Sequence, residues 1–584
     1  MKKLLFFAML LALAACETGN GMKDSKDVET NYISINLVTA AGTGTRADAY
    51  DPAGGENKDY EDGTDTENTV KSIRFYFFDA GKEAVAVKKS GDGYVSYLDW
   101  PGGDGTEIKD EGSDHANTVE KILNAMLIIN PAEKGKVPAF LVAVLNPTKE
   151  IKEASIANVS KLTELIDDYS AYTADNFIMS NSVFANGDEE KVKVDAVNVE
   201  KHLYTTAEAA LADPVTVYVE RVLAKATLST TLTAAKEIGG EKLYLPNKAE
   251  TTAGAGDGKD YKYNGKQIYV KFLGWNVTAT AKTSRLMKEI NSGWEDKDLF
   301  GSNTPWNWAG VRSFWAVNPG TMAYNYFDFG LKYDKDTGEY VQTEDGKKAA
   351  NALTVGQGIA YMQENAAESL VSNTVETPTK VIIAAQLVDE SGDPMEFAEF
   401  AFEQYTVEAL KVKYAELSNI YIITTETSGT KYTKITAEDI KLVTATAAGQ
   451  ADENRSGRYY TYANINMETK KTYCIGNTEG APAATEEAIN EELVKLGHAK
   501  VWTNGFTYYY FDIKHLGTSV GEYGVVRNHV YKSVVDGLTG LGTPVYNPDE
   551  VIYPEKPGDE DTFLAAQIKI LSWRIVNGQY KLDW

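Results

Sequence analysis

Short runs in which apolar and polar residues alternate recur along this chain of 584 residues. In residues 31–40, Ile33, Ile35 and Leu37 alternate with polar residues, which is the pattern of a half-buried strand. Further β-type runs occupy residues 70–79, 84–88, 139–146, 215–222, 267–280 and 379–388. Because successive side chains of a strand point to opposite faces, such runs are typical of sheets. The sequence therefore predicts a mainly β fold.

A few short segments are predicted to be helical. Residues 118–130 and 160–169 are interpreted as short helices, the second with a cap at Ser160. Residues 485–496 predict a third helix, because their apolar residues share one face and Gly497 follows as a stop. The other predictions of this kind are a hairpin of residues 507–515 with 525–535, a loop with a short strand at residues 177–184, and a long irregular loop at residues 291–326.

Length and composition limit the class of protein. The chain has room for two or three domains, and new alternation after Asp213 and Pro214 predicts a boundary there. A formal net charge of −26 argues against nucleic acid or an anionic membrane surface as the main partner. The 35 tyrosines and 48 glycines, with scattered charged residues, are typical of an extracellular β-rich protein.

The N-terminus has the pattern of a lipoprotein signal peptide. Lys2 and Lys3 precede an apolar segment, residues 4–13, that is too short to span a bilayer. Small residues stand directly before Cys16, as a lipoprotein signal peptidase requires. We therefore expect the mature lipoprotein to begin at a lipid-bearing Cys16, and Glu17 behind it resembles an outer-membrane address. The alternative is an ordinary secretory signal with a chance cysteine.

A loop of small residues follows the first predicted strand. Residues 41–47 contain glycine, threonine and alanine around one arginine, Arg46, which suits a trypsin-like protease. Residues 48–69 continue as an acidic, glycine-rich loop. Cleavage at Arg46 would separate the strand of residues 31–40 from everything downstream.

The C-terminal segment combines a tether with a β-type strand. Residues 546–561 contain three prolines and a cluster of acids, so an extended and solvated backbone is expected. Residues 562–573 are apolar and β-branched. Since exposed strand edges recruit other chains, two interpretations stay open. This strand either pairs within its own domain or complements a neighbouring subunit.

Matches to catalytic motifs have better structural explanations. Residues 517–521 read G-x-S-x-G, but another predicted strand follows them, so a hairpin loop is favoured over a nucleophile elbow. Residues 334–338 begin like a calcium loop but lack its later ligands, which favours a β-turn. Cys474 has no disulfide partner once Cys16 is acylated, and is predicted to be a buried structural cysteine. The five histidines show no paired metal spacing, so no enzyme, cofactor or metal site is predicted.

Several sequence blocks resemble those of Bacteroidales fimbrillins. Residues 523–535 are similar to their V-R-N-x-x-Y block, residues 217–225 to their V-x-V-E-R-x-x-A-K pattern, and residues 361–365 to their Y-x-x-E-N segment. Residues 561–573 look like the ending of the shaft subunit of minor (Mfa-type) fimbriae. With the lipoprotein signal and the Arg46 loop, the resemblance runs from end to end.

The resemblance implies two transthyretin-like Greek-key β-sandwich domains with a few short helices. The expected limits are residues 1–15 for the signal peptide, 16–46 for the propeptide with the removable strand, 47–214 and 215–545 for the two sandwich domains, and 546–584 for the tether and C-terminal donor strand.

The resemblance also implies assembly of a type V pilus by donor-strand exchange. An arginine-specific protease would cut between Arg46 and Ala47, and the strand with Ile33, Ile35 and Leu37 would leave a groove. The C-terminal strand of another copy would fill this groove, and such a head-to-tail contact builds a filament because it does not close. The residues expected in the donor strand are Phe563, Leu564, Ala566, Ile568, Ile570 and Trp573.

The implied partners are other copies of this chain, fimbrial tip and anchor subunits, the protease, and the outer membrane through the lipid of the precursor. The implied location is a cell-surface fimbria that supports adhesion or biofilm formation. The alternative is a surface lipoprotein that does not polymerise and acts as a fimbrial tip, an anchor or an adhesin for glycans or proteins.

Overall fold

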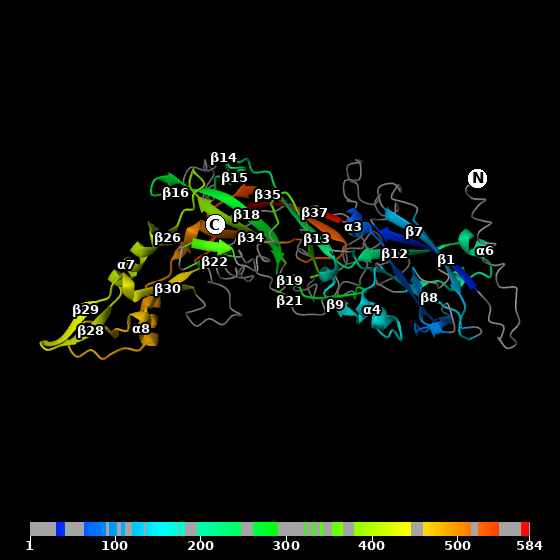
Figure 1. The fold of residues 1–584 in the computed structure, drawn as a ribbon, viewed down its shortest axis with the longest axis horizontal. Helices are drawn as coiled ribbons and strands as arrows, with labels where there is room; N and C mark the ends of the chain where they lie inside the picture. Colours follow the sequence, from blue (N-terminus) through cyan, green and yellow to red (C-terminus); the bar gives the residue numbers. More distant parts are fainter. Residues whose placement is uncertain are drawn as a thin grey trace, which may run out of the picture.

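The computed structural model describes residues 31–40, 63–88, 93–101, 107–110, 119–133, 136–173, 176–181, 196–246, 261–289, 322–323, 331–334, 339–342, 353–365, 379–444, 460–514, 524–547 and 574–582. Within these residues the chain is mainly β with a few short helices, so the predicted fold class is confirmed. Two units lie along the long axis of the molecule, with β1, β7 and β8 at one end and α7, α8 and β28 at the other (Figure 1).

One large sheet forms the first unit. Its strand order is β5-β2-β8-β10-β12-β1-β7-β6, and β11 pairs with β8 beside this path. The strands are β1 (Asn31–Ala40), β2 (Ile73–Phe78), β5 (Tyr97–Trp100), β6 (Glu107–Asp110), β7 (Val119–Ile129), β8 (Phe140–Leu145), β10 (Met179–Asn181), β11 (Val197–Asn198) and β12 (Val215–Arg221). Their apolar side chains, among them Phe75, Leu127, Leu141 and Val217, form one continuous core.

Short elements complete the first unit. They are α3 (Asp65–Asn68), β3 (Val87–Lys88), β4 (Tyr94–Val95), α4 (Lys149–Glu153), α5 (Val159–Thr163), β9 (Ile166–Asp167) and α6 (Ala207–Ala212). Threonine or asparagine side chains cap these four helices, as expected for short helices whose first backbone amides need an acceptor.

Two sheets pack face to face in the second unit and make a sandwich. The first sheet contains β24 (Ala360–Met362), β13 (Ala224–Thr230), β35 (His529–Leu538) and β37 (Arg574–Leu582), in that order. The second contains β14 (Lys236–Ile238), β15 (Glu241–Tyr244), β18 (Tyr269–Thr278), β25 (Lys380–Val388), β34 (Phe506–Asp512) and β36 (Thr543–Pro544). Side chains from both sheets, such as Leu228, Trp275, Ile383 and Tyr531, meet in one core.

Short strands surround this sandwich. They are β16 (Lys262–Tyr263), β17 (Lys266–Gln267), β19 (Thr280–Ala281), β20 (Ser284–Arg285), β21 (Met322–Ala323), β22 (Leu331–Asp334) and β23 (Glu339–Gln342). Of these, β20 pairs with β9 of the first unit, so the two units share a small sheet.

A module with a core of its own is inserted between β25 and β34. Its elements are β26 (Phe397–Phe400), β27 (Glu403–Tyr405), α7 (Val407–Leu417), β28 (Ile420–Glu426), β29 (Gly429–Lys434), β30 (Ile440–Thr444), β31 (Thr461–Ile465), β32 (Thr472–Ile475), α8 (Glu486–Val494) and β33 (Lys500–Trp502). Its β28–β29 hairpin and α8 lie at the end of the molecule opposite to β1 (Figure 1). Cys474 is buried here, as predicted, and burial raises the pKa of its thiol.

The chain passes from the first unit to the second at Val222 and Leu223. Strand β12 pairs with β1 and β10 of the first sheet, whereas β13 pairs with β24 and β35 of the second unit. The boundary predicted before Val215 is therefore seven residues earlier than the change of sheet. The domain limits themselves stay a prediction.

Two secondary-structure predictions are wrong. Within the predicted helix of residues 118–130, Val119–Ile129 form strand β7, because β1 and β6 supply ladder partners on its two edges. Residues 507–515 and 525–535 do not form a hairpin, because β34 pairs with β25 and β36 while β35 pairs with β13 and β37 in the opposite sheet. Both errors concern partners that are distant in sequence.

The other predicted elements are found with shifted ends. Helix α8 begins directly after its N-cap Thr485. Gly497 follows the helix with a φ of 96°, a left-handed conformation in which a helix cannot continue. The predicted helix of residues 160–169 is shorter in the structure, since α5 ends at Thr163 and β9 follows it; the cap of α5 is Asn158 instead of Ser160. Strand β10 is the short strand predicted within residues 177–184. None of the helices in the described segments is long and apolar enough to cross a membrane.

Asn146 joins three segments of the first unit through its side chain. Its Oδ1 accepts from the backbone N–H groups of Lys71 (2.7 Å) and Ser72 (3.4 Å), and its Nδ2 donates to the carbonyls of Thr69 and Phe177, both at 2.8 Å. The residue is buried and its φ is 53°, a left-handed conformation that asparagine tolerates better than most residues.

We expect Asn146→Gly to lower the free energy of unfolding by about 1–3 kcal/mol, because four backbone groups lose their partner. Asn146→Ala loses the same hydrogen bonds and adds left-handed strain of about 1–2 kcal/mol, so it is the less stable variant. Urea unfolding of both variants measures this order. A loss below about 0.5 kcal/mol for Asn146→Gly contradicts the role given to the amide.

Candidate functional site: the first strand and the buried network beside it

Strand β1 lies between β12 and β7 in the middle of the first sheet. All ten of its residues pair antiparallel with β7, from Asn31 opposite Ile129 to Ala40 opposite Val119. On its other edge, Ile35 to Thr39 pair parallel with Val215 to Val219 of β12. Among the described strands, β1 is therefore the one that connects β12 to β7. Its removal would leave a slot with two open ladders.

The side chains of β1 contribute to the core of the first unit. Ile33 and Ile35 are 1% and 0% exposed and belong to its apolar cluster. Ser34, on the opposite face, is 3% exposed. The side chain of Leu37 lies outside the described residues. Loss of each buried isoleucine exposes surface worth about 1.5–3 kcal/mol, so an empty slot favours another apolar strand.

Both walls of this slot have further contacts. Strand β7 pairs with β6. Directly after β7, the backbone carbonyl of Asn130 accepts a hydrogen bond from the backbone N–H of Lys88 at 2.7 Å. Strand β12 pairs with β10 over Val219, Glu220 and Arg221 only, among the strands described. The end of β12 then enters a buried polar cluster between the two units. We call this cluster the junction network; it contains Glu67, Glu220, Arg221, Lys225, Lys288, Tyr361, Glu364, Arg527 and Asn528.

Glu67 of α3 is the centre of one half of the junction network. It is fully buried and receives hydrogen bonds from Lys225 Nζ at 3.0 and 3.2 Å and from the Tyr361 hydroxyl at 2.7 Å. Its carboxylate also accepts from the backbone N–H of Thr64, which closes a capping box. Burial, together with the hydrogen bond to Glu67, raises the pKa of Tyr361, so this hydroxyl stays protonated and donates.

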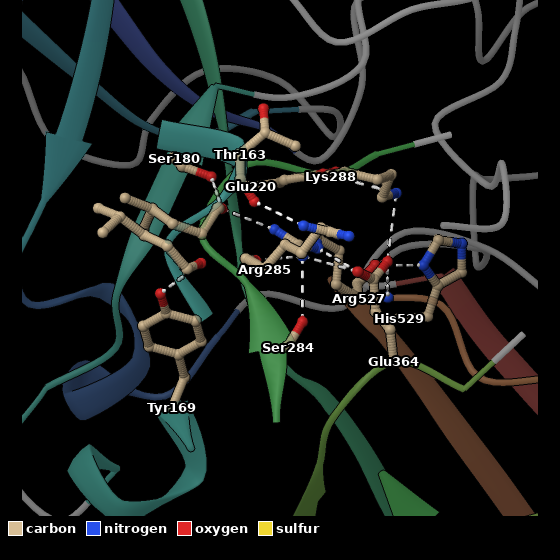
Figure 2. Close-up of polar contacts among 12 residues, drawn as sticks. Thr163, Tyr169, Ser180, Glu220, Ser284, Arg285, Lys288, Glu364, Arg527 and His529 are labelled. Carbon is tan, nitrogen blue, oxygen red and sulfur yellow. Dashed lines mark hydrogen bonds and ion pairs between the residues drawn. The ribbon is translucent and has the colours of Figure 1, made fainter. Parts of the chain in front are cut away.

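Arg527 of the second unit is the centre of the other half (Figure 2). Its guanidinium contacts the Glu364 carboxylate at 2.7 Å and donates to the carbonyls of Arg285 (2.7 Å) and Leu286 (2.9 Å). The carbonyl of Leu286 also accepts from the Ser180 hydroxyl of β10 at 2.5 Å. The Leu286 carbonyl is thus bonded both to Arg527 of the second unit and to Ser180 of the first.

Lys288 connects the end of β12 to the second unit (Figure 2). Its Nζ lies 3.5 Å from Glu220 and 3.7 Å from Glu364, and all three side chains are buried. Leu286 and Met287 directly precede Lys288 in the sequence. Their side chains are buried in the core of the first unit, although they follow strands of the second unit in the chain. The segment therefore contributes both apolar and ionic contacts across the junction.

The three internal blocks behind the sequence resemblance meet in this network. Residues 217–225 supply Glu220, Arg221 and Lys225, residues 361–365 supply Tyr361 and Glu364, and residues 523–535 supply Arg527 and Asn528. Arg221 Nη1 donates to Asn528 Oδ1 at 3.1 Å and so joins two blocks 307 residues apart. Sequence analysis named these blocks but assigned them no structural role, and it missed Glu67 and Lys288, for which no motif was visible.

Most of the predicted processing and donor residues lie outside the described residues. These are Cys16, Arg46, Ala47, Phe563, Leu564, Ala566, Ile568, Ile570 and Trp573, as well as the G-x-S-x-G match. The described segments contain no group of three or more His, Cys, Asp or Glu side chains that could hold a metal ion. Strand β37 directly follows the predicted donor segment and pairs parallel with β35, from Arg574 opposite His529 to Leu582 opposite Leu538.

Residues 500–578 match the family model described as "Major fimbrial subunit protein type IV, Fimbrillin, C-terminal". The C-terminal part of this chain is therefore similar to the C-terminal region of fimbrillins. The predicted resemblance to fimbrillins is thereby confirmed, and the matched fimbrillin region contains β34, β35 and the Arg527 centre of the junction network.

Solved structures of adhesion and fimbrial proteins are also similar to this fimbrillin-like chain. A fimbrilin of Porphyromonas gingivalis W83 is 14% identical over 95% of this chain and 98% of its own, with a TM-score of 0.34. A cell adhesion protein of Parabacteroides distasonis is 13% identical over 62% and 77%, with a TM-score of 0.30. The tip fimbrial protein Mfa3 of P. gingivalis is 13% identical over 70% and 99%, with a TM-score of 0.24. These TM-scores are low, and no curated protein sequence matches the chain.

We expect Glu67→Gln to lower the free energy of unfolding by about 3–5 kcal/mol, because it leaves the Lys225 ammonium buried without its counter-charge. The double variant Glu67→Gln with Lys225→Met removes both charges and recovers a large part of this loss. Chemical denaturation of the parent chain, of Glu67→Gln and of the double variant measures both the loss of stability and its recovery.

The matched control is Glu133→Gln, which breaks the exposed Glu133–Lys136 pair (2.9 Å) and shifts stability by less than about 0.5 kcal/mol. If Glu67→Gln behaves like this control, the buried pair does not hold the junction together.

Proposed function

We propose that this chain is a structural subunit of a bacterial surface fimbria, of the Mfa-type shaft class. It is exported as a lipoprotein acylated at Cys16 and cut after Arg46 by an arginine-specific protease. Strand β1 then leaves the first sheet, and the C-terminal strand of another copy takes its place. Repetition of this exchange builds a filament with tip and anchor subunits at its ends.

The position of β1 is the observation that supports the proposal. It is a central strand at the N-terminal end of the described chain, paired on both edges, and the predicted Arg46 cut lies between it and β2. Removal of a central strand leaves unpaired backbone groups and exposed apolar surface. Another strand with alternating apolar residues can pair with these groups and cover this surface. The fimbrillin match of residues 500–578 supports the same assignment.

A second candidate is a surface lipoprotein that does not polymerise, such as a tip, an anchor or an adhesin. The pairing of β37 with β35 favours this candidate, because the C-terminal segment then has a place in its own fold. A strand that is already paired must be released before it can be donated to another copy.

We expect treatment of the precursor with an arginine-specific protease to give an N-terminus at Ala47 and a ladder of polymers. The ladder is visible in unboiled samples and collapses on boiling, since strand exchange is non-covalent. Arg46→Ala abolishes both the cut and the ladder, whereas deletion of residues 562–584 keeps the cut and abolishes the ladder. N-terminal sequencing beside a boiled and unboiled gel reads both outcomes.

Thr45→Ala is the matched control, because it changes the loop next to the cut but keeps the arginine. It forms the same ladder as the parent chain. Polymer that persists after deletion of residues 562–584 contradicts the donor-strand assignment, and a precursor that is cut but stays monomeric favours the second candidate.

A further inference from the structure

The β12 wall of the β1 slot is supported at one end when β1 is absent. Within the described strands, Val215 to Val219 of β12 pair with β1, while β10 pairs only with Val219 to Arg221. The first four residues of β12 therefore have β1 as their ladder partner, and the other described strand reaches only the far end. When β1 leaves, β12 becomes a strand fixed at its C-terminal end.

The side chains at that fixed end belong to the junction network. Glu220 faces Lys288 at 3.5 Å, and Arg221 Nε donates to the carbonyl of Glu67 at 3.1 Å. Arg221 also reaches Asn68 and, at 3.1 Å, Asn528. These partners come from α3 and from the second unit, neither of which contains β1. The contacts therefore persist whether the slot is filled or empty.

We propose that Glu220 and Lys288 are positioning residues that keep the β12 wall in place while the slot is empty. The inference rests on the proposed function, because the slot is empty only after β1 has left. With β1 present, five ladder pairs align β12 in any case. Without β1, the wall is aligned by the packing of alternate valines and by the anchor at Glu220 and Arg221.

A wall that is held in register accepts an incoming strand at lower entropic cost than a wall that must first be ordered. Glu220 and Arg221 hold the end of β12 through the buried contacts of their charged side chains. Lys288 lies between Glu220 of the wall and Glu364, and Glu364 is fixed by Arg527 of the second unit. Contacts with the second unit thus hold the C-terminal end of β12 in place while the slot is empty.

Binding of a synthetic peptide with the sequence of residues 31–40 tests the inference directly. The full chain is cut at Arg46, the released strand is removed, and labelled peptide is titrated by fluorescence anisotropy. We expect Glu220→Gln and Lys288→Met to weaken peptide binding at least tenfold. We also expect them to speed amide hydrogen exchange of residues 215–218 in the cut protein but not in the uncut one.

Asp512→Asn is the matched control. It breaks the partly buried ion pair of Asp512 with Lys380, which lies between β34 and β25 of the second unit. This variant lowers thermal stability but binds the peptide within twofold of the parent chain. Glu220→Asp, which keeps the charge, restores part of the affinity and replaces Glu220→Gln if that variant fails to fold.

The outcomes separate the two proposals. If the parent protein and Glu220→Gln bind the peptide equally well, the positioning role is overturned. The proposed function, which needs only the slot, is then unaffected. Parent protein that neither releases its first strand nor binds the peptide overturns the proposed function, and the positioning role with it. Equal weakening of binding by Asp512→Asn and Glu220→Gln shows a general loss of stability and also overturns the positioning role.

Discussion

The first unit depends on one strand that comes from the far end of its sequence. Strand β1 supplies the hydrogen bonds that connect β12 to β7, and its isoleucines fill the centre of the core. Strand β1 is held more firmly than an edge strand, because all of its residues pair with β7 and Ile35 to Thr39 also pair with β12. Its removal would leave a slot of one length with one apolar face.

The junction network adds a different kind of constraint. Buried charges are weak evidence for stability, because desolvation offsets much of their attraction. Their value lies in orientation, since Glu67 accepts from Lys225 and Tyr361, and Arg527 holds Glu364, only in one relative placement of the two units. The apolar contacts of Leu286 and Met287 tolerate more variation than these charged pairs do. Apolar packing therefore brings the units together and the ions define their register.

The C-terminal strand β37 is held by fewer ladder partners than β1. Strand β37 occupies an edge of the second sandwich beside β35, next to the segment predicted as donor. An edge strand has one ladder instead of two, so its release exposes fewer backbone groups than release of a central strand such as β1.

The sequence by itself determined the mainly β class, β1 with its alternating isoleucines, the capped helix α8 and the buried Cys474, because these depend on local periodicity, capping and composition. It also determined the family resemblance, through blocks that the structure brings together in the junction network. Only the tertiary structure decided that residues 119–129 are a strand, since β7 takes its conformation from ladders to β1 and β6. The same holds for Glu67 and Lys288, which no motif marks. A buried ion pair is defined by the distance between its charges, and that distance exists only after segments distant in the sequence have packed together.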